Sequence, residues 1–330
     1  MRAVVVERTG GPEVLEVKPM PTPEPGPGEV RIDVEASGVN FLDVYERMGK
    51  YSKQTPFIAG SEGCGVVTAL GDGVDTVATG DRVAWAMVPG GGYADQVVIP
   101  AERAVPVPDA VGAEQAAAVM LQGMTAHYLT ESTFPVRAGQ TALVHAAAGG
   151  LGLLLTQILV GKGVRVIGTA STPVKAALAS QAGASEVIDY TERDVAVEVR
   201  RLTDNRGVDV VYDGVGKATF DGSLDSLARR GMMVLVGAAS GPVPPVDPQT
   251  LNKKGSLFLT RPTLAHHIAE RVELLERAAA VLGQVADGRL DVRIGARYAL
   301  AEAARAHEDL AGRRSTGKLL IIPGRATAGG

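Results

Sequence analysis

The chain has 330 residues, enough for two ordinary domains, and 45% of them are hydrophobic while 21% are charged. Its net charge of -4 gives no electrostatic basis for binding nucleic acid or an anionic membrane surface. Charged residues interrupt the N-terminal segment, and the longest apolar run, residues 151–160, is too short to span a bilayer. We therefore expect a cytoplasmic protein without membrane insertion.

The first third of the chain is rich in glycine and proline, and its apolar runs are short. Strands are predicted at residues 2–8, 29–39, 65–70, 81–87 and 93–100. Turn-forming residues separate these runs, which is typical of a compact, β-barrel-like domain. A helical stretch at residues 112–133 follows and ends before Pro135.

From Thr141 onward, predicted strands alternate with predicted helices. The strands are expected at 141–147, 164–171, 185–190, 207–215 and 232–240, and the helices at 150–163, 172–183, 194–204 and 218–231. Such alternation predicts a parallel sheet with helices wound on both faces, so the fold class is α/β. The C-terminal part is expected to form a helix at 266–287, a strand at 293–300, a helix from Ala301 and a strand at 317–323.

A glycine-rich turn lies between the first of these strands and its helix. It reads Ala147-x-Gly149-x-x-Gly152, a dinucleotide fingerprint with alanine in place of the first glycine. Alanine is tolerated there only if its φ angle is negative. Gly149 would allow the backbone to approach a pyrophosphate, Gly152 would allow close packing of helix and strand, and the helix would offer free N–H groups to the phosphates. The turn therefore predicts dinucleotide binding.

The end of the second strand distinguishes the two nicotinamide dinucleotides. An NAD site usually has an acidic residue there, but this chain has Ala170, followed by Ser171, Thr172 and Lys175. Hydroxyl groups and a lysine suit a 2′-phosphate, which a carboxylate would repel. Lys175 could also be an ordinary solvated helix residue, but we favour NADPH as the cofactor.

Few residues of this sequence could bind a metal ion. The single cysteine, Cys64, excludes internal disulfides and cysteine-based zinc clusters, and we interpret it as a small buried side chain. The five histidines form no metal-binding pair and are interpreted as surface or satisfied core residues. We expect no metal site.

Several motifs resemble the zinc-free quinone oxidoreductase branch of the medium-chain dehydrogenase/reductase superfamily, the group that includes ζ-crystallin. They lie at residues 36–51, 60–67, 80–85, 145–152, 210–216 and 251–262. The resemblance covers essentially the whole chain. It implies a GroES-like catalytic domain at residues 1–123 and 266–330, interrupted by a Rossmann NADPH-binding domain at residues 124–265.

The resemblance also implies a set of cofactor contacts. Those at the 2′-phosphate end are Ser171, Thr172, Lys175, Tyr190 and Arg313, and those at the pyrophosphate are Gly149, Gly150, Leu151 and Gly152. Those toward the nicotinamide are Asn40, Phe41, Tyr45, Thr125 and Tyr128, and backbone contacts are expected at Val215, Ser240 and Thr263.

Related zinc alcohol dehydrogenases carry metal ligands at three positions where this chain has Asn40, Ser61 and Leu121. The resemblance therefore implies reduction of a quinone without zinc. Asn40 would hydrogen-bond near the nicotinamide or the quinone oxygen, Tyr45 and Tyr51 would line the substrate slot, and Thr125 would steady the nicotinamide ring. We weigh positioning above proton donation for Tyr45, because an unperturbed phenol has a pKa of about 10.

Two alternatives remain open at this point. Related branches reduce activated C=C bonds of alkenals, enones or enoyl thioesters, and other relatives serve as crystallins or RNA-binding proteins. The family also pairs commonly through its Rossmann domain, so residues 231–240 are our expected edge strand in a homodimer. The sequence does not identify the physiological acceptor, nor whether electrons leave singly or as hydride.

Overall fold

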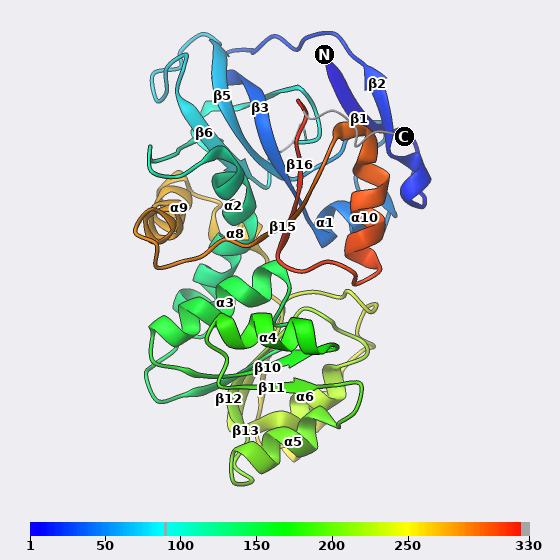
Figure 1. Ribbon diagram of the computed structural model, residues 1–330, viewed down its shortest axis with the longest axis vertical. Coiled ribbons are helices and arrows are strands. Elements are labelled where there is room, and N and C mark those ends of the chain that lie inside the picture. Colours follow the sequence, from blue (N-terminus) through cyan, green and yellow to red (C-terminus); the bar gives the residue numbers. More distant parts are fainter. Residues whose placement is uncertain (89–90, 325–330) are drawn as a thin grey trace. The chain divides into compact units, whose positions relative to one another are not determined.

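A computed structural model describes residues 1–88 and 91–324 of the chain, which divides into two compact units. Unit 1 comprises residues 1–124 and the described part of 267–330, and unit 2 comprises residues 125–266. Figure 1 shows the strand-rich N-terminal elements in blue and cyan and the elements of unit 2 mainly in green and yellow. Among the described residues, no helix is long and apolar enough to cross a membrane.

Unit 1 is built on two sheets. The smaller has the order β2-β1-β4, and the larger has the order β15-β16-β3-β5-β6-β8, with β7 also paired to β3. The strands are β1 (Arg2–Val6), β2 (Glu16–Pro19), β3 (Glu29–Val39), β4 (Phe57–Ile58), β5 (Glu62–Leu70), β6 (Arg82–Ala86), β7 (Gln96–Pro100), β8 (Val105–Pro106), β15 (Ile294–Tyr298) and β16 (Lys318–Ile321). Side chains alternate between buried and partly exposed along the first part of β3, as expected for a strand with one face on a core.

The last strand of the chain lies inside the sheet formed by the first part of the chain. β16 pairs antiparallel with β3, with Leu319 opposite Val39, and parallel with β15 on its other side. The helices α1 (Phe41–Arg47), α9 (Arg271–Ala286) and α10 (Ala303–Ala311) belong to unit 1. The short helix α8 (Leu264–His267) lies at the boundary, with only its last residue in unit 1. The helix predicted at 266–287 is interrupted at residues 268–270, where the chain bends between α8 and α9.

Unit 2 is a doubly wound parallel sheet. Its strand order is β11-β10-β9-β12-β13-β14. All strands are parallel, and the order of the strands along the chain changes sense between β9 and β12, which is the topological switch point of the sheet. The strands are β9 (Thr141–Val144), β10 (Arg165–Ala170), β11 (Glu186–Asp189), β12 (Val208–Asp213), β13 (Leu227–Leu235) and β14 (Phe258–Thr260). The helices are α3 (Gly150–Gly161), α4 (Pro173–Gln181), α5 (Val195–Leu202), α6 (Phe220–Ser226) and α7 (Pro248–Lys253). Figure 1 shows α3 and α4 on one side of this sheet and α5 and α6 on the other.

Two expectations for this sheet are wrong. The helix predicted at 218–231 ends at Ser226, because strand β13 begins at Leu227 and passes through Arg230, whose φ angle is +63°. Residues 231–235 are also not at an edge of the sheet, since β14 pairs with β13 on its outer side. The edge strand on this side of the sheet is β14, which is only three residues long and gave no periodic signal in the sequence.

Helix α2 (Ala113–Tyr128) begins in unit 1 and ends in unit 2, and a π-helical turn at Leu129–Thr133 continues it. The predicted helical stretch of 112–133 is thereby confirmed. In unit 2 the core is formed by apolar side chains between the sheet and its helices, among them Leu143, Ile167, Val211 and Leu224, all fully buried. This core fixes the carboxyl ends of β9, β10 and β12, at which the candidate site begins.

Candidate cofactor and catalytic site

The glycine-rich turn has the geometry expected of a dinucleotide-binding loop. Ala147 lies outside the left-handed region, as expected, whereas Ala146, one residue earlier, has a φ angle of +50°, a conformation that is unfavourable for a residue other than glycine. A Cβ atom at Gly152 would overlap the carbonyl oxygen of Ala146 and lie 2.8 Å from Cα of Ala147. The absence of a side chain at Gly152 therefore permits the close packing of α3 on the turn, as predicted.

The amino end of α3 is suited to an anion. Gly149 is the N-cap residue, no side chain caps the helix, and its first turn contains no acidic residue. Other helices of unit 2 are capped by their own side chains, for example α4 by Thr172 and α5 by Asp194. Uncapped N–H groups at a helix start bind phosphate groups. The backbone of Gly150, Leu151 and Gly152 thus fits a pyrophosphate.

A buried chain of hydrogen bonds connects this turn to the loop after β12. Nε2 of His145 lies 3.0 Å from the hydroxyl of Ser223, which donates to Oδ2 of Asp213 at 2.8 Å. The other oxygen of Asp213 accepts from the backbone N–H groups of Val215 and Gly216. Burial lowers the pKa of His145 and opposes the effect of Asp213, so the imidazole is neutral at pH 7.

The direction of these bonds follows from the neutral imidazole. Because the proton of Ser223 goes to Asp213, its oxygen accepts from Nε2–H of His145, and Nδ1 is left as an acceptor for the hydroxyl of Thr169 at 3.3 Å. Thr169 in turn accepts from the N–H of Ala146. The loops after β9 and β12 are thereby held by one continuous network.

The residues expected at the 2′-phosphate belong to both units. Ser171, Thr172 and Lys175 follow β10, and Tyr190 follows β11 with its N–H bonded to the carbonyl of Ala170 at 3.2 Å. The hydroxyl of Thr172 accepts from the N–H of Lys175 and so acts as a helix cap. Unit 2 therefore brings these four residues together at the ends of two adjacent strands, whereas Arg313 is an exposed residue of unit 1.

The three predicted backbone contacts lie in loops at the carboxyl ends of strands. Val215 follows β12, Ser240 follows β13, and Thr263 follows β14. Ser240 fixes two of these loops, because its hydroxyl donates to the carbonyl of Val215 and accepts from the N–H of Ala218. Ligands bind at this end of open α/β sheets.

The residues expected near the nicotinamide also come from both units. In unit 1, Asn40 is the N-cap residue of α1, and the rings of Phe41, Tyr45 and Tyr51 form an aromatic cluster. The Tyr45 and Tyr51 rings are 5.3 Å apart and inclined by 62°. In unit 2, Thr125 and Tyr128 are buried on the last turn of α2.

Sequence reasoning missed a buried charged group around Asn40. Oδ1 of Asn40 accepts from Nζ of Lys318 at 2.7 Å, and Nδ2 of Asn40 donates to Oε1 of Glu62 at 2.7 Å. Lys318 and Glu62 also form an ion pair of 2.5 Å, with 2% and 0% of their side chains exposed. The second oxygen of Glu62 accepts from the backbone N–H of Leu121 at 2.6 Å. Charged residues in otherwise apolar strands were the only sequence signal.

A second buried network adjoins the first. Asp43 accepts hydrogen bonds from the hydroxyls of Ser61 and Tyr93 and from the N–H of Asn40. Burial raises the pKa of Asp43 to about 6. Tyr93 also lies 3.2 Å from Nε2 of His307, and burial lowers the pKa of that imidazole to about 3.

The three positions of the metal ligands of the zinc alcohol dehydrogenases thus have other hydrogen-bonding partners. Asn40 and Leu121 both donate to Glu62, and Ser61 donates to Asp43. Amide, hydroxyl and leucine side chains are poor zinc ligands. Within the described ranges, no three His, Cys, Asp or Glu side chains are grouped as a metal site. Cys64 is buried, and its burial raises the pKa of the thiol to about 12, which fits a packing role.

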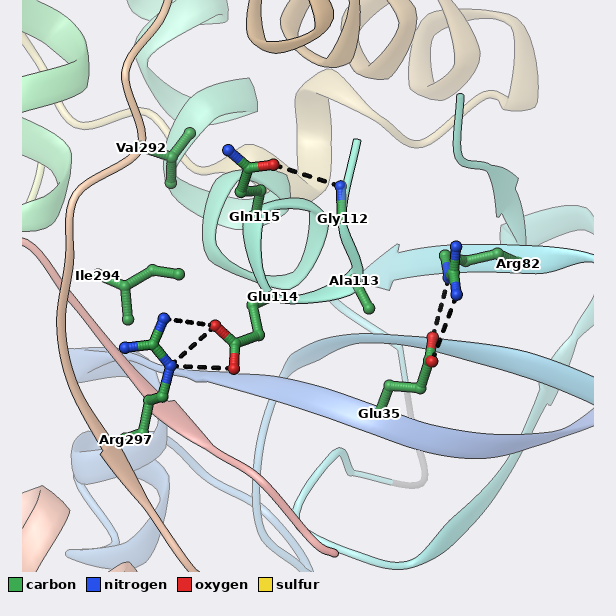
Figure 2. Close-up of a pocket in the computed structure, with 9 residues that line it drawn as sticks. All are labelled: Glu35, Arg82, Gly112, Ala113, Glu114, Gln115, Val292, Ile294 and Arg297. Atoms are coloured by element: carbon green, nitrogen blue, oxygen red, sulfur yellow. Dashed lines mark hydrogen bonds and ion pairs between the residues drawn. The ribbon is translucent and has the colours of Figure 1, made fainter. Parts of the chain in front are cut away.

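Figure 2 shows a separate pocket of unit 1, at the amino end of α2. Two ion pairs line it, one between Arg82 and Glu35 and the other between Arg297 and Glu114. Its described lining contains none of the predicted site residues. We therefore do not assign this pocket to the candidate site, and both of its guanidinium groups are paired with glutamates.

The fold and site together define the medium-chain dehydrogenase/reductase class. The sequence matches the alcohol dehydrogenase GroES-like domain over residues 26–109 and the zinc-binding dehydrogenase family over residues 150–277. The quinone oxidoreductase of Pseudomonas aeruginosa is 48% identical over 95% of this chain and 97% of its own length. The chain belongs to the quinone oxidoreductase branch of the medium-chain dehydrogenase/reductase superfamily.

Two further relatives bear on cofactor and substrate. The structure of Escherichia coli quinone oxidoreductase complexed with NADPH has a TM-score of 0.96 and 39% identity, covering 98% of this chain and 100% of that chain. A 2-haloacrylate reductase from a Burkholderia species is 38% identical over 97% of this chain and 98% of its own length.

Proposed function

We propose that the chain is an NADPH-dependent quinone oxidoreductase that works without zinc. The single observation that supports this most is the hydrogen bonding at Asn40 and Ser61: the carbonyl oxygen of Asn40 accepts from Lys318, and the hydroxyl of Ser61 donates to Asp43. The leucine side chain at the third position, Leu121, has no atom that could bind zinc. A quinone suits such a site because its conjugated carbonyls are already electrophilic and need little polarisation.

The residues of unit 2 fit NADPH. The uncapped start of α3 would hold the pyrophosphate, and Lys175 with Ser171 would hold the 2′-phosphate at the end of β10, where no carboxylate stands. Arg313 of unit 1 would add a second cation at that phosphate. When bound, the nicotinamide supplies the hydride. Asn40 and Thr125 would orient its ring.

The aromatic cluster of unit 1 supports a planar substrate. Tyr45 and Tyr51 present their rings at an inclined angle, and 42% of Tyr51 is exposed. Flat, conjugated rings pack well against such side chains. Holding the acceptor close to the nicotinamide accounts for most of the acceleration that this chemistry requires. Water can protonate the reduced quinone, so Tyr45 acts by positioning.

The test is NADPH oxidation with 1,4-benzoquinone and 9,10-phenanthrenequinone, followed by the loss of nicotinamide absorbance. A parallel set uses NADH. We expect fast turnover with quinones and NADPH and slow turnover with NADH. Absence of quinone turnover by protein that binds NADPH would contradict the proposal.

A second candidate is reduction of an activated C=C bond, which the similarity to the 2-haloacrylate reductase favours. The same assay with 2-chloroacrylate and a 2-alkenal distinguishes the two. Activity with these and none with quinones would assign the protein to the double-bond reductases. An RNA-binding role has no support in the net charge of the chain, which is -4.

We also propose a homodimer formed through unit 2. Its edge strand β14 carries Phe258, of which 56% is exposed, and an unpaired strand edge is a template for another chain. A cytoplasmic location completes the proposal. Sedimentation that detects only monomer at micromolar concentration would overturn the dimer.

A further inference from the structure

We infer that Lys318 and Glu62 are positioning residues that set the orientation of the Asn40 amide for the reaction. This inference rests on the proposed function only for the role of Asn40 at the nicotinamide or the acceptor. The arrangement itself lies entirely within unit 1.

The chemistry of the partners allows one orientation of the amide. An ammonium group can only donate, and an ionised carboxylate can only accept. Oδ1 of Asn40 must therefore face Lys318, and Nδ2 must face Glu62, as the distances of 2.7 Å to each show. Reversal of the amide would place donor against donor and acceptor against acceptor, in a site where 3% of Asn40 is exposed.

The pair also changes the electronic character of the amide. The ammonium withdraws density from the carbonyl of Asn40, and the carboxylate polarises the N–H bond that it accepts, so the hydrogen bonds strengthen one another. Nδ2 also donates a long hydrogen bond of 3.5 Å to the carbonyl of Gly38, which is weak enough to be exchanged for a bond to a ligand. This N–H is the group that we assign to the nicotinamide or the acceptor oxygen.

Gly38 provides independent evidence that the backbone accommodates the pair. A Cβ atom there would overlap Oε1 of Glu62 and lie 2.6 Å from Cε of Lys318. The φ angle of Gly38 is not in the left-handed region, so an alanine there would meet no backbone strain but would force the side chains of Glu62 and Lys318 to shift. Strand β3 thus leaves room for the two charged side chains directly beside Asn40.

Glu62 further ties Asn40 to helix α2. Its second oxygen accepts from Leu121, one helical turn before Thr125, the other residue expected at the nicotinamide. The Glu62 carboxylate therefore accepts one hydrogen bond from Asn40, the N-cap residue of α1, and another from the backbone N–H of Leu121 in α2.

The test is a double-mutant cycle between Lys318→Met and Asn40→Ala, measured with the acceptor that the wild-type enzyme reduces best. In the background with Asn40, we expect Lys318→Met to lower kcat about 100-fold, the effect of a misplaced catalytic group. In the Asn40→Ala background, the same change should alter kcat less than about twofold, because the group that Lys318 orients is gone. Lys318→Arg should recover part of the activity, and the exposed Lys253→Met is the matched control.

Two readouts do not depend on turnover. The NADPH dissociation constant, from nucleotide fluorescence, should change less than about threefold in Lys318→Met, because the phosphate contacts lie elsewhere. A crystal structure of this variant without ligands should show the Asn40 amide turned or in two conformers. If Lys318→Met fails to fold, Glu62→Gln combined with Lys318→Met removes both buried charges, and Gly38→Ala displaces the pair without removing either charge.

Equal losses of kcat from Lys318→Met in the two backgrounds would overturn the inference and leave a purely structural role. An unchanged kcat and an unmoved amide would also overturn it. Failure of the proposed function is a different result: the wild-type protein would then reduce 2-chloroacrylate and not quinones, and the same cycle would be run with that acceptor.

Discussion

The imidazole of His145 and the hydroxyl of Ser223 are 3.0 Å apart and join the glycine-rich turn to Asp213, which holds the loop after β12. We expect Ser223→Ala to leave buried polar groups unsatisfied and to lower the free energy of unfolding by about 1–3 kcal/mol. NADPH binding should weaken as well, since both loops are predicted to contact the cofactor.

Ser226→Ala is the matched control for this prediction. Ser226 is on the same helix and equally buried, but its hydroxyl bonds only to the carbonyl of Gly222 within the helix. Urea unfolding and NADPH fluorescence titration measure both variants. Equal effects of the two substitutions on unfolding free energy and NADPH affinity would show that the network through Ser223 contributes no more than a single buried hydroxyl bond.

Gly152→Ala should disturb the turn, because the added methyl group would overlap the carbonyl of Ala146. We expect a loss of about 1–3 kcal/mol in unfolding free energy and a higher NADPH dissociation constant. Gly161→Ala in the same helix meets nothing within 4 Å and should stabilise the protein by about 0.5–1 kcal/mol. Thermal and urea unfolding of both variants check this. An unchanged NADPH affinity in Gly152→Ala would contradict the assignment of the turn.

Lys175→Met should weaken NADPH binding about 10- to 100-fold, because it removes the charge-assisted hydrogen bond that we predict between Lys175 and the 2′-phosphate. NADH lacks that phosphate, so its dissociation constant should change less than about twofold. Lys253→Met, on the exposed side of α7, is the control. A similar loss for NADH and NADPH would mean that Lys175 acts on the loop and not on the phosphate.

His307 and Asp43 should give opposite contributions to stability in acid. The pKa of His307 is lowered by burial from 6.5 to about 3, so the unfolded chain binds a proton that the folded chain does not, and stability is lost as the pH falls through this window. Burial raises the pKa of Asp43 from 3.8 to about 6, so its folded form takes up a proton first and is favoured as the pH falls from 6 to 3.8.

The measurement is the free energy of unfolding by urea between pH 3.5 and pH 7. This range covers most of the interval between the folded and unfolded pKa values of His307 and of Asp43. His307→Gln should make the loss of stability in acid less steep, by at most the contribution of one proton, which is about 1.4 kcal/mol per pH unit. Asp43→Asn should make this loss steeper. His266→Gln, at an exposed histidine, is the control. Parallel pH curves for all three variants would refute the assignment.

The periodic parts of the fold could be predicted from the sequence. The strand expected at 29–39 is β3 to the residue, and the helix expected near Gly150 begins there. Long apolar runs bounded by turn residues determine such elements locally. By contrast, β14 has three residues, and its position outside β13 depends on the completed sheet. For that reason the edge strand was misassigned.

The polar networks could not be predicted in the same way. Glu62 and Lys318 are 256 residues apart, and each sequence segment shows only one charged residue beside apolar ones. Their pairing depends on β16 lying next to β3. The roles predicted for Lys175, Tyr190 and Arg313 stay predictions, and the described geometry supplies the residues on which to test them.

The placement of β16 between β3 and β15 also governs the order in which a newly made chain can mature. Unit 2 is contiguous in sequence and can fold while synthesis continues. The larger sheet of unit 1 can be completed only after β16 has left the ribosome. Lys318 arrives with that strand. A chain truncated before β16 would retain the glycine-rich turn but lack the lysine that holds the Asn40 amide, so we expect such a product to be unable to oxidise NADPH.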